Sequence, residues 1–335
     1  MSRRYKGGVI SATAPVPTGP LQCGTANGIW TLPQQMQSAA AGTWPTQGTV
    51  SATLAIFALG YNICCSTGTT TRNKYTFSGC VNAAATASSA ISQLGSAAGN
   101  GTVGIFALGR TPCNPSTTRN KYTYSGDVNA VATASSTVSS GGSAAGNATV
   151  GIFAIGSAST TRNKYTYSGC TSAAATASNV SSAYGSAAGN STVGIFAIGF
   201  SCCAIPSTTR NKYTYSGDTN AVATAATAAS IYQSAAGNAT VGIFALGNVG
   251  GSASTTRNKY TYSGCVNAAA TASSAASNGG AAAGNATVGI FALGRDLTTR
   301  EKYTYSGCVN AAATASSAAS LYGSAASNGT TGVNV

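Results

Sequence analysis

The chain has 335 residues, of which only 6 % are charged, with 17 lysines and arginines against 4 acids and no histidine. The formal charge of +13 favours anionic partners such as lipopolysaccharide, nucleic acid or an acidic protein, although charge kept for solubility explains it equally well. Without histidine, the composition excludes a histidine general base and a mixed Cys/His zinc site. The sequence contains no run of 18 apolar residues, so we predict no transmembrane helix.

Residues 1–48 contain no copy of the repeat that fills the rest of the chain. Their start, MSRRYKGGVISATAP, is basic but has no apolar core, so it is not a convincing secretory signal. The segment is too poor in apolar residues to fold alone, yet it holds both tryptophans, which are costly to leave in water. We therefore predict an extended N-terminal arm that docks on a partner, with docking on its own repeat domain as the alternative. The residues expected to bind are Arg3, Arg4, Lys6, Trp30 and Trp44.

Residues 49–335 are built from two alternating phrases. TTRNKYTYSG or a close variant occurs six times, its arginines 43–48 residues apart, and IFALG or IFAIG precedes each copy. A period of this length is one supersecondary unit that is too small to bury its own apolar face. The segments KYTYSG, VNAAATAS, GSAAGN and ATVGIFALG predict four short strands per unit, with Gly-Asn as a hairpin turn before the last.

The two ends of the array are complementary partial units. The array opens with TVSATLAIFALG at 49–60, which lacks the small-residue strand, and LYGSAASNG at 321–329 supplies it. An open solenoid would instead need polar caps at both ends. We therefore predict an all-β domain, a six-bladed β-propeller of four-stranded blades closed by pairing of the 50–60 strand with the C-terminal segment. The unit resembles the kelch repeat, but it has one glycine where kelch has two, and no tryptophan.

Each repeat phrase carries an arginine and a lysine two residues apart, which a strand directs to the same face. One interpretation is a multivalent anion-binding ring. The other, which the six-fold identity favours, is a structural clasp whose aliphatic stems cover tyrosine rings and whose charged heads bond loop carbonyls. The pairs are Arg72 and Lys74, Arg119 and Lys121, Arg162 and Lys164, Arg210 and Lys212, Arg257 and Lys259, and Arg300 and Lys302.

The position after the SG of each repeat phrase is occupied by cysteine in four units and by aspartate in two, which indicates an exposed turn. Because equivalent positions in different blades lie far apart, we expect no disulfides within the cysteine set. Catalysis needs groups that titrate or ligate, and the few acids are scattered, so we predict no enzyme, no cofactor and no metal site. The residues at this position are Cys80, Asp127, Cys170, Asp218, Cys265 and Cys308.

Two further features belong to loops. The linkers between IFALG and TTR differ in length and sequence, and variable loops on one rim of a rigid ring are where recognition is expected. The pairing of their cysteines, Cys64, Cys65, Cys113, Cys202 and Cys203, cannot be read from sequence. The asparagines of the five N-x-S/T sequons fill the turn position after glycine, and we interpret them as turn residues: Asn100, Asn147, Asn190, Asn238 and Asn285.

Within the arm, GGVISATAPVPTGP followed by GIWTLPQQMQSAAAGTWPTQG resembles the leader of virion structural proteins of tailed bacteriophages, especially aquatic phages. In that family the leader precedes varied domains, including arrays of the KYTYSG…GIFALG type. The resemblance implies a non-enzymatic tail, fibre or decoration protein, assembled in the host cytoplasm and released in the virion by lysis.

The partners expected on this basis are other virion proteins, further copies of the chain and host surface polysaccharide, with neither specific nucleic-acid binding nor membrane insertion. An alternative function, which is compatible with the first, is a receptor-binding or lectin-like propeller that recognises host surface glycans. A secreted enzyme is disfavoured because the residues for catalysis are lacking.

Overall fold

The computed structural model describes residues 53–62, 67–111, 114–201 and 205–328. Internal contacts divide the chain into residues 1–50 and 51–335, and everything described belongs to the second unit. The predicted arm, with its arginines, lysine and tryptophans, lies outside the described residues, as do the five loop cysteines. The described ranges contain strands and no helix, and hence no helix suited to crossing a membrane.

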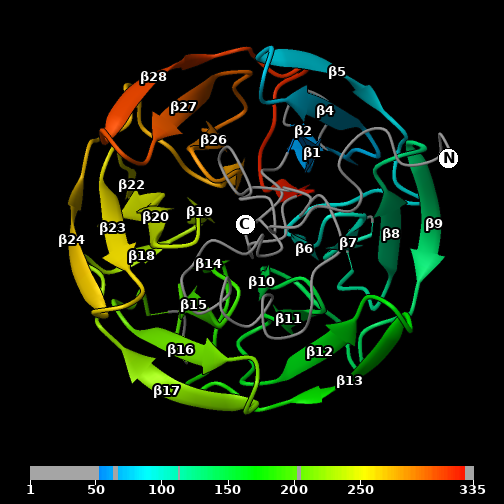
Figure 1. Cartoon of the computed structure of the whole chain (residues 1–335), viewed down its shortest axis with the longest axis horizontal. Helices are drawn as coiled ribbons and strands as arrows, with labels where there is room; N and C mark the ends of the chain where they lie inside the picture. Colours follow the sequence, from blue (N-terminus) through cyan, green and yellow to red (C-terminus); the bar gives the residue numbers. More distant parts are fainter. Residues whose placement is uncertain (1–52, 63–66, 112–113, 202–204, 329–335) are drawn as a thin grey trace, which may run out of the picture. The chain divides into compact units, whose positions relative to one another are not determined.

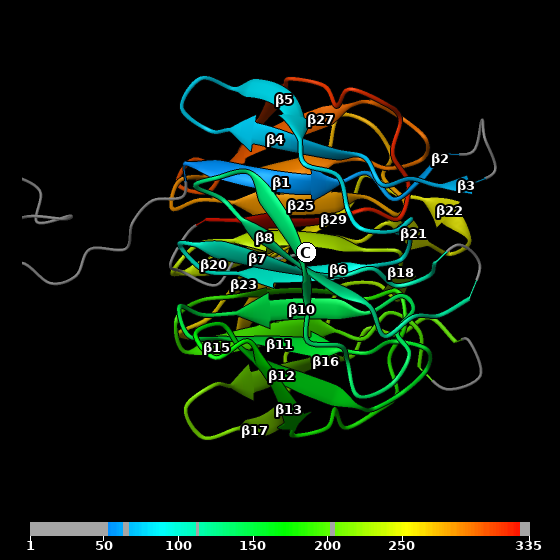
Figure 2. The same ribbon diagram turned by 90° about the vertical axis from the view of Figure 1, so that its right-hand side faces the viewer.

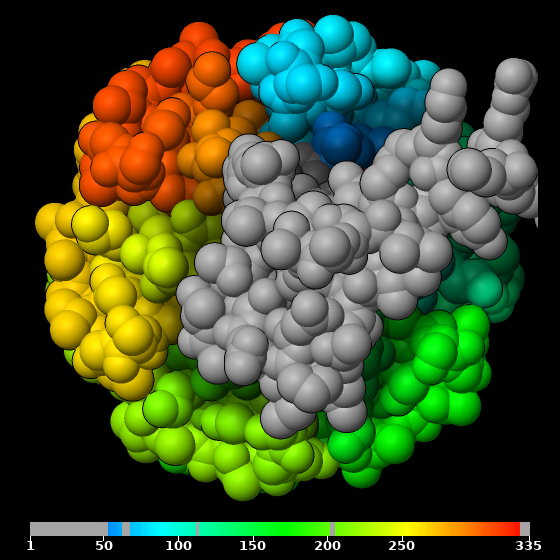
Figure 3. Space-filling view, viewed as in Figure 1, coloured from blue at the N-terminus to red at the C-terminus, as the bar shows by residue number. Residues whose placement is uncertain are grey.

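The described residues form six antiparallel four-stranded sheets that share one strand order, and these sheets surround a common centre (Figure 1). The all-β prediction is confirmed, and the arrangement is that of a β-propeller. Each sheet uses the four predicted segments, and we call its strands first to fourth from the centre outward. On the surface the colours run once round in sequence order, and the orange-red last sheet lies beside the cyan first one (Figure 3).

The first strands are short runs of small, buried residues, and each contacts the first strands of both neighbouring sheets around the centre. Their lack of bulk allows this close approach. They are β6 Ser96–Gly99, β10 Ser143–Gly146, β14 Ser186–Gly189, β19 Ser234–Gly237, β25 Ala281–Gly284 and β29 Ser324–Ser327.

The second strands carry the branched and aromatic residues of the IFALG phrase, whose isoleucine and phenylalanine are at most 1 % exposed. They are β1 Leu54–Ala58, β7 Val103–Ala107, β11 Val150–Ala154, β15 Val193–Ala197, β20 Val241–Ala245 and β26 Val288–Ala292. The third strands follow with the sequence RNKYT, or REKYT in the last of them. They are β4 Arg72–Thr76, β8 Arg119–Thr123, β12 Arg162–Thr166, β16 Arg210–Thr214, β23 Arg257–Thr261 and β27 Arg300–Thr304.

The fourth strands form the rim and consist mostly of exposed and half-buried positions, which agrees with their weaker, alanine-rich sequence. They are β5 Val81–Ala85, β9 Val128–Ala132, β13 Thr171–Ala175, β17 Thr219–Ala223, β24 Val266–Ala270 and β28 Val309–Ala313. Five shorter strands belong to the linkers and their surroundings. They are β2 Tyr61–Asn62, β3 Thr67–Gly68, β18 Ser230–Ile231, β21 Asn248–Val249 and β22 Ser252–Ala253.

One sheet is built from both ends of the array. Strand β29 pairs with β1, with Ala55 opposite Ser327, so the order of this sheet is β29-β1-β4-β5. The predicted pairing of the 50–60 strand with the C-terminal segment is therefore confirmed.

The closing sheet also reproduces the hairpin found in the other sheets. The Asn328 Oδ1 atom accepts hydrogen bonds from the backbone N–H groups of Thr53 and Leu54 at 2.8 and 3.0 Å. Asn147 makes the same two bonds, both 2.9 Å long, inside the continuous β10–β11 hairpin. In the closing sheet the described chain is interrupted between residues 328 and 53. This interruption falls inside a hairpin turn, and Asn328 still makes the side-chain hydrogen bonds of that turn.

The two faces of the ring differ in what they carry (Figure 2). On one face, which we call the linker face, lie the six connections from second to third strands, including β2, β3, β21 and β22. On the other, which we call the hairpin face, lie the first-to-second and third-to-fourth connections together with Thr53 and Asn328. The variable loops and the ends of the described unit are therefore on opposite faces.

Candidate functional site

The repeated arginines are buried between neighbouring sheets. The guanidinium carbon of Arg119 lies 4.6 Å from the centre of the Phe153 ring in the next sheet. Its Nη2 atom donates to Asn163 Oδ1 at 3.1 Å and its Nη1 atom to Ser172 Oγ at 2.9 Å, both also in the next sheet. A cation over an aromatic face, with charge-assisted hydrogen bonds in a site away from water, joins the two sheets strongly.

This geometry corrects the arginine half of the predicted anion-binding ring, because all six side chains are at most 1 % exposed. The structural clasp is correct in outline, but the heads bond side-chain oxygens instead of loop carbonyls and lie closer to phenylalanine than to tyrosine rings. Burial lowers the pKa of Arg72 to about 10, so this group is still charged at neutral pH. The buried arginines are Arg72, Arg119, Arg162, Arg210, Arg257 and Arg300.

One clasp differs from the others. Glu301 stands where the other five sheets have asparagine, and its Oε2 atom is 2.7 Å from Nη2 of Arg257. Both side chains are at most 1 % exposed. The carboxylate also accepts a 2.7 Å hydrogen bond from the backbone N–H of Ser274. This is the only fully buried ion pair among the described residues.

The lysines are half-buried, and five of the six reach the turn of the next sheet. The Nζ atoms of Lys74 and Lys164 lie 3.3 and 3.4 Å from carboxylate oxygens, and each of these side chains is 32 % exposed. Three others lie 3.6–3.8 Å from a cysteine Sγ atom, in the pairs Lys121–Cys170, Lys212–Cys265 and Lys259–Cys308. Anion binding by the lysines, Lys302 included, stays a prediction.

The position shared by cysteine and aspartate is a turn, as predicted, but it is half-buried instead of exposed. Cys80 and Asp127 both have a left-handed backbone, with φ of 49° and 51°. The four cysteines at this position are free thiols in separate sheets. Within the described ranges no three histidine, cysteine, aspartate or glutamate side chains gather as a metal ion would require.

The carboxylate of Asp127 is held by the preceding sheet and by its own. Burial raises its pKa, but hydrogen bonds from the Thr86 N–H, the Tyr122 hydroxyl and Lys74 outweigh burial and lower the pKa to about 2. The folded-state pKa is thus below the unfolded value, so this carboxylate stabilises the fold above about pH 4. Its contribution is lost as the pH falls towards 2.

We expect Asp127→Cys to fold normally, because cysteine occupies the equivalent turn in four other sheets. Urea midpoints measured from pH 7 to pH 2 should fall less steeply for this variant than for the native chain, since one depressed carboxylate pKa has been removed. Cys80→Ser, at the same turn of another sheet, is the control and should leave the slope unchanged. Parallel pH profiles for the native chain and Asp127→Cys would contradict the assignment.

The sequon asparagines perform the turn role predicted for them. The Asn100 Oδ1 atom accepts hydrogen bonds from the N–H groups of Thr102 and Val103, both 3.0 Å long. Its Nδ2 atom donates to the carbonyl of Ala148 in the next sheet at 3.0 Å. The side chain therefore closes its own hairpin and also links it to its neighbour.

The residue two positions before each small first strand contributes to a closed ring of backbone hydrogen bonds at the centre of the linker face. Each member donates its N–H to the carbonyl oxygen of the preceding member at 2.6–3.0 Å. All six have φ between 55° and 64°, a conformation that is uncommon outside glycine. We call this the axial ring, and its members are Leu94, Gly141, Tyr184, Tyr232, Gly279 and Tyr322.

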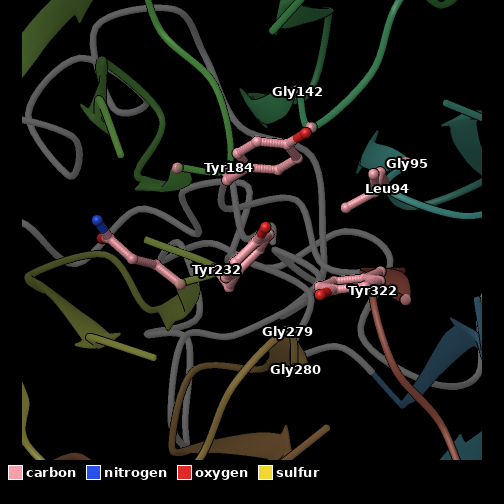
Figure 4. A pocket seen from close by; sticks show the side chains of 12 residues that line it. Leu94, Gly95, Gly142, Tyr184, Tyr232, Gly279, Gly280 and Tyr322 are labelled. Carbon is pink, nitrogen blue, oxygen red and sulfur yellow. The ribbon is translucent and has the colours of Figure 1, made fainter. Parts of the chain in front are cut away.

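The side chains of the axial ring break the symmetry that its backbone keeps (Figure 4). The Tyr232 ring centre lies 4.8 Å from that of Tyr184 and 5.0 Å from that of Tyr322. Glycines make room for two of the rings, because a Cβ atom at Gly279 would lie 2.7 Å from Tyr322 and one at Gly141 would lie 2.5 Å from Tyr184. Burial raises the pKa of Tyr232 to about 12, so its phenol is neutral at physiological pH.

Together with Leu94 and Gln233, these tyrosines line an open hollow whose cavity volume is about 30 Å³. Its rings are half-buried, which leaves part of each available to a ligand. We did not predict this site from sequence. The signal that could have found it is the one variable residue, leucine, glycine or tyrosine, that precedes the otherwise similar G-S-A-A-G segments.

No family model and no curated protein matches this chain. Among solved structures, the chain is similar to TolB from Acinetobacter baumannii, with a TM-score of 0.56 and 12 % identity over 88 % of this chain and 70 % of that one. It is also similar to YjhT, with a TM-score of 0.54 and 9 % identity over 72 % of this chain and 93 % of that one. Both are β-propeller-like proteins, and at these identities the likeness supports the fold alone.

Proposed function

We propose that this protein is a non-enzymatic component of a phage virion, such as a tail, fibre or decoration protein. In this proposal the N-terminal arm anchors the chain to other virion proteins, and a six-bladed β-propeller presents its linker face to the surroundings. The phage assignment is supported by the resemblance of residues 1–48 to phage virion leaders. The six-blade count is supported by the six four-stranded sheets of the described residues and by their closure through β29.

The observation that carries the proposal is that the attachment point of the arm and the variable linkers lie on opposite faces. Thr53, to which the arm is joined, lies on the hairpin face beside Asn328. The six variable linkers and the axial ring lie on the opposite face. A propeller held through its hairpin face would leave the variable loops free for contact, which is where binding residues are expected on a rigid scaffold.

A non-enzymatic role is supported by the contacts that the ionisable groups make in the repeated geometry of the sheets. The six arginines, five of the six lysines and Asp127 are engaged in contacts that join one sheet to the next. These groups therefore stabilise the packing between sheets and do not converge on a reaction centre. The second proposed role, recognition of host surface glycans, is favoured by the axial ring, whose tyrosines break the six-fold symmetry on the face that would be displayed.

The anchoring role is tested by a chain that starts at residue 49. We expect its far-ultraviolet circular dichroism to keep the β spectrum, because the described sheets draw no residue from the arm. We also expect it not to co-purify with particles, because the tryptophans of the arm act as buried anchors at its partner. A full-length chain with Asp296→Asn, a change on the linker face, is the control and should be incorporated.

Normal incorporation of the shortened chain would show that the arm is not the anchor, and loss of its β spectrum would show that the arm is part of the fold.

A further inference from the structure

We propose that the axial ring binds the terminal ring of a neutral saccharide, which stacks on the exposed surface of the Tyr184, Tyr232 and Tyr322 rings at the open mouth of the cavity. This inference deepens the glycan-recognition role proposed above and rests on it. It follows from two properties of the site, namely its aromatic walls and the lack of charge in its lining.

The walls supply flat, rigid, amphipathic surfaces. The planes of Tyr184 and Tyr232 meet at 47° and those of Tyr232 and Tyr322 at 44°, so the three rings surround the centre instead of stacking flat. Figure 4 shows these rings around one opening, with Leu94 opposite. A sugar ring has an apolar C–H face that suits a tyrosine ring, and its hydroxyls suit the polar edge of a phenol. Tyrosine also contributes such contact area at low entropic cost, because it has only two side-chain torsions.

The absence of charge decides the class of saccharide. The cavity is lined by tyrosine, glycine, leucine and glutamine, and none of its lining residues is charged. Arg110, on a nearby linker, donates its Nε–H to Ser140 Oγ at 3.1 Å. The lining therefore offers a carboxylate or phosphate no opposite charge, and Arg110, which acts on Tyr232 from outside the lining, is held by Ser140, so the lining favours neutral sugars over acidic ones.

The test uses the purified full-length chain and saturation-transfer NMR with the methyl glycosides of glucose, galactose, mannose and N-acetylglucosamine. We expect saturation of the ring C–H protons of at least one of them. Tyr232→Leu should weaken its binding about tenfold or more, since a contact worth 1.4 kcal/mol corresponds to a factor of ten. Leucine fits this backbone, because Leu94 has the same φ of 55° at the same place in another sheet. Val131→Ala, an exposed residue of the rim strand β9 outside the cavity lining, is the control and should change the affinity less than about twofold.

Absence of binding by all four glycosides overturns the proposal, as does equal binding by the native chain and Tyr232→Leu. Stronger binding of sialic acid or adenosine than of any neutral glycoside also overturns it, because each needs a different site chemistry. Incorporation of Tyr232→Leu into particles is measured in parallel. A failed saccharide test with normal incorporation leaves the anchoring role standing, whereas a variant that binds sugar as the native chain does but is not incorporated counts against a purely recognition role for Tyr232.

Discussion

Replacing Glu301 by alanine is expected to destabilise the fold by about 3–5 kcal/mol, because it leaves the buried Arg257 guanidinium without its counter-charge. Glu301→Asn should instead cost about 1 kcal/mol or less. Asparagine occupies this position in the other five sheets, where a single Oδ1 atom accepts both the hydrogen bond from an arginine Nη2 and the one from a backbone N–H. In one of them Arg72 Nη2 and the Ser89 N–H donate to Asn120 Oδ1 at 3.3 and 2.9 Å.

Urea unfolding followed by tyrosine fluorescence measures this difference. Asn120→Ala is the matched control and should fall between the two Glu301 variants, because Arg72 loses a neutral acceptor instead of a charge. If Glu301→Ala unfolds at the native midpoint, or Glu301→Asn is as unstable as Glu301→Ala, the carboxylate does not have the role assigned to it.

The strand pattern could be predicted from sequence because it depends on local properties. KYTYSG and GIFALG combine β-branched and aromatic residues, and Gly-Asn marks the hairpin between first and second strands. The closure could also be predicted, since two incomplete units were complementary in sequence. The pairing of Ala55 with Ser327 is the result.

The burial of the arginines could not be predicted, because it depends on how neighbouring sheets pack. The alternation of side chains along a strand indicates which of them share a face of the sheet. In a propeller, however, that face packs against the next sheet instead of contacting solvent. Arg119 therefore meets Phe153 and Asn163, which are more than 30 residues away along the chain. The clue in the sequence was the exchange of asparagine for glutamate at position 301, which adds a charge beside an arginine of the preceding unit.

The axial ring was missed for a similar reason. Tyr184, Tyr232 and Tyr322 are separated by 48 and 90 positions, and nothing local indicates that their rings meet. Their convergence comes from the left-handed backbone at each position and from the ring of N–H to carbonyl bonds that places six equivalent residues around one centre.

Three repeated side-chain contacts between sheets run in one direction around the ring. An arginine reaches the asparagines of the next sheet, a lysine reaches the next turn, and a hairpin asparagine reaches the next hairpin carbonyl. Where the last sheet meets the first, Arg300 donates to Asn82 and Asn73 at 2.6 and 3.3 Å. The last sheet therefore contacts the first in the same way as each sheet contacts the next one along the chain. The stability of every sheet thus depends on contacts with a neighbour on each side, and the stability of the fold depends on the pairing of β29 with β1.

A chain that ends at residue 320 is therefore expected to lose most of its free energy of unfolding, which for a domain is about 5–15 kcal/mol. Without β29, the edge of β1 is unpaired, and the buried Ile56 and Phe57 beside it become accessible to other chains. The measurement is a urea unfolding curve with light scattering, which should show a broad transition at low urea and aggregation.

The control keeps every strand and moves the break. In this permuted chain residues 102–328 are followed by one alanine and then by residues 53–100, which turns the break between residues 328 and 53 into an Asn-Ala-Thr hairpin like that at Asn147. Its unfolding midpoint should be close to that of residues 53–328 in native order, because Asn328 already makes the hairpin bonds across the break. A stable, cooperative chain without β29 would contradict closure as the source of stability. A permuted chain that fails to fold would show that the position of the break matters beyond the pairing of β29 with β1.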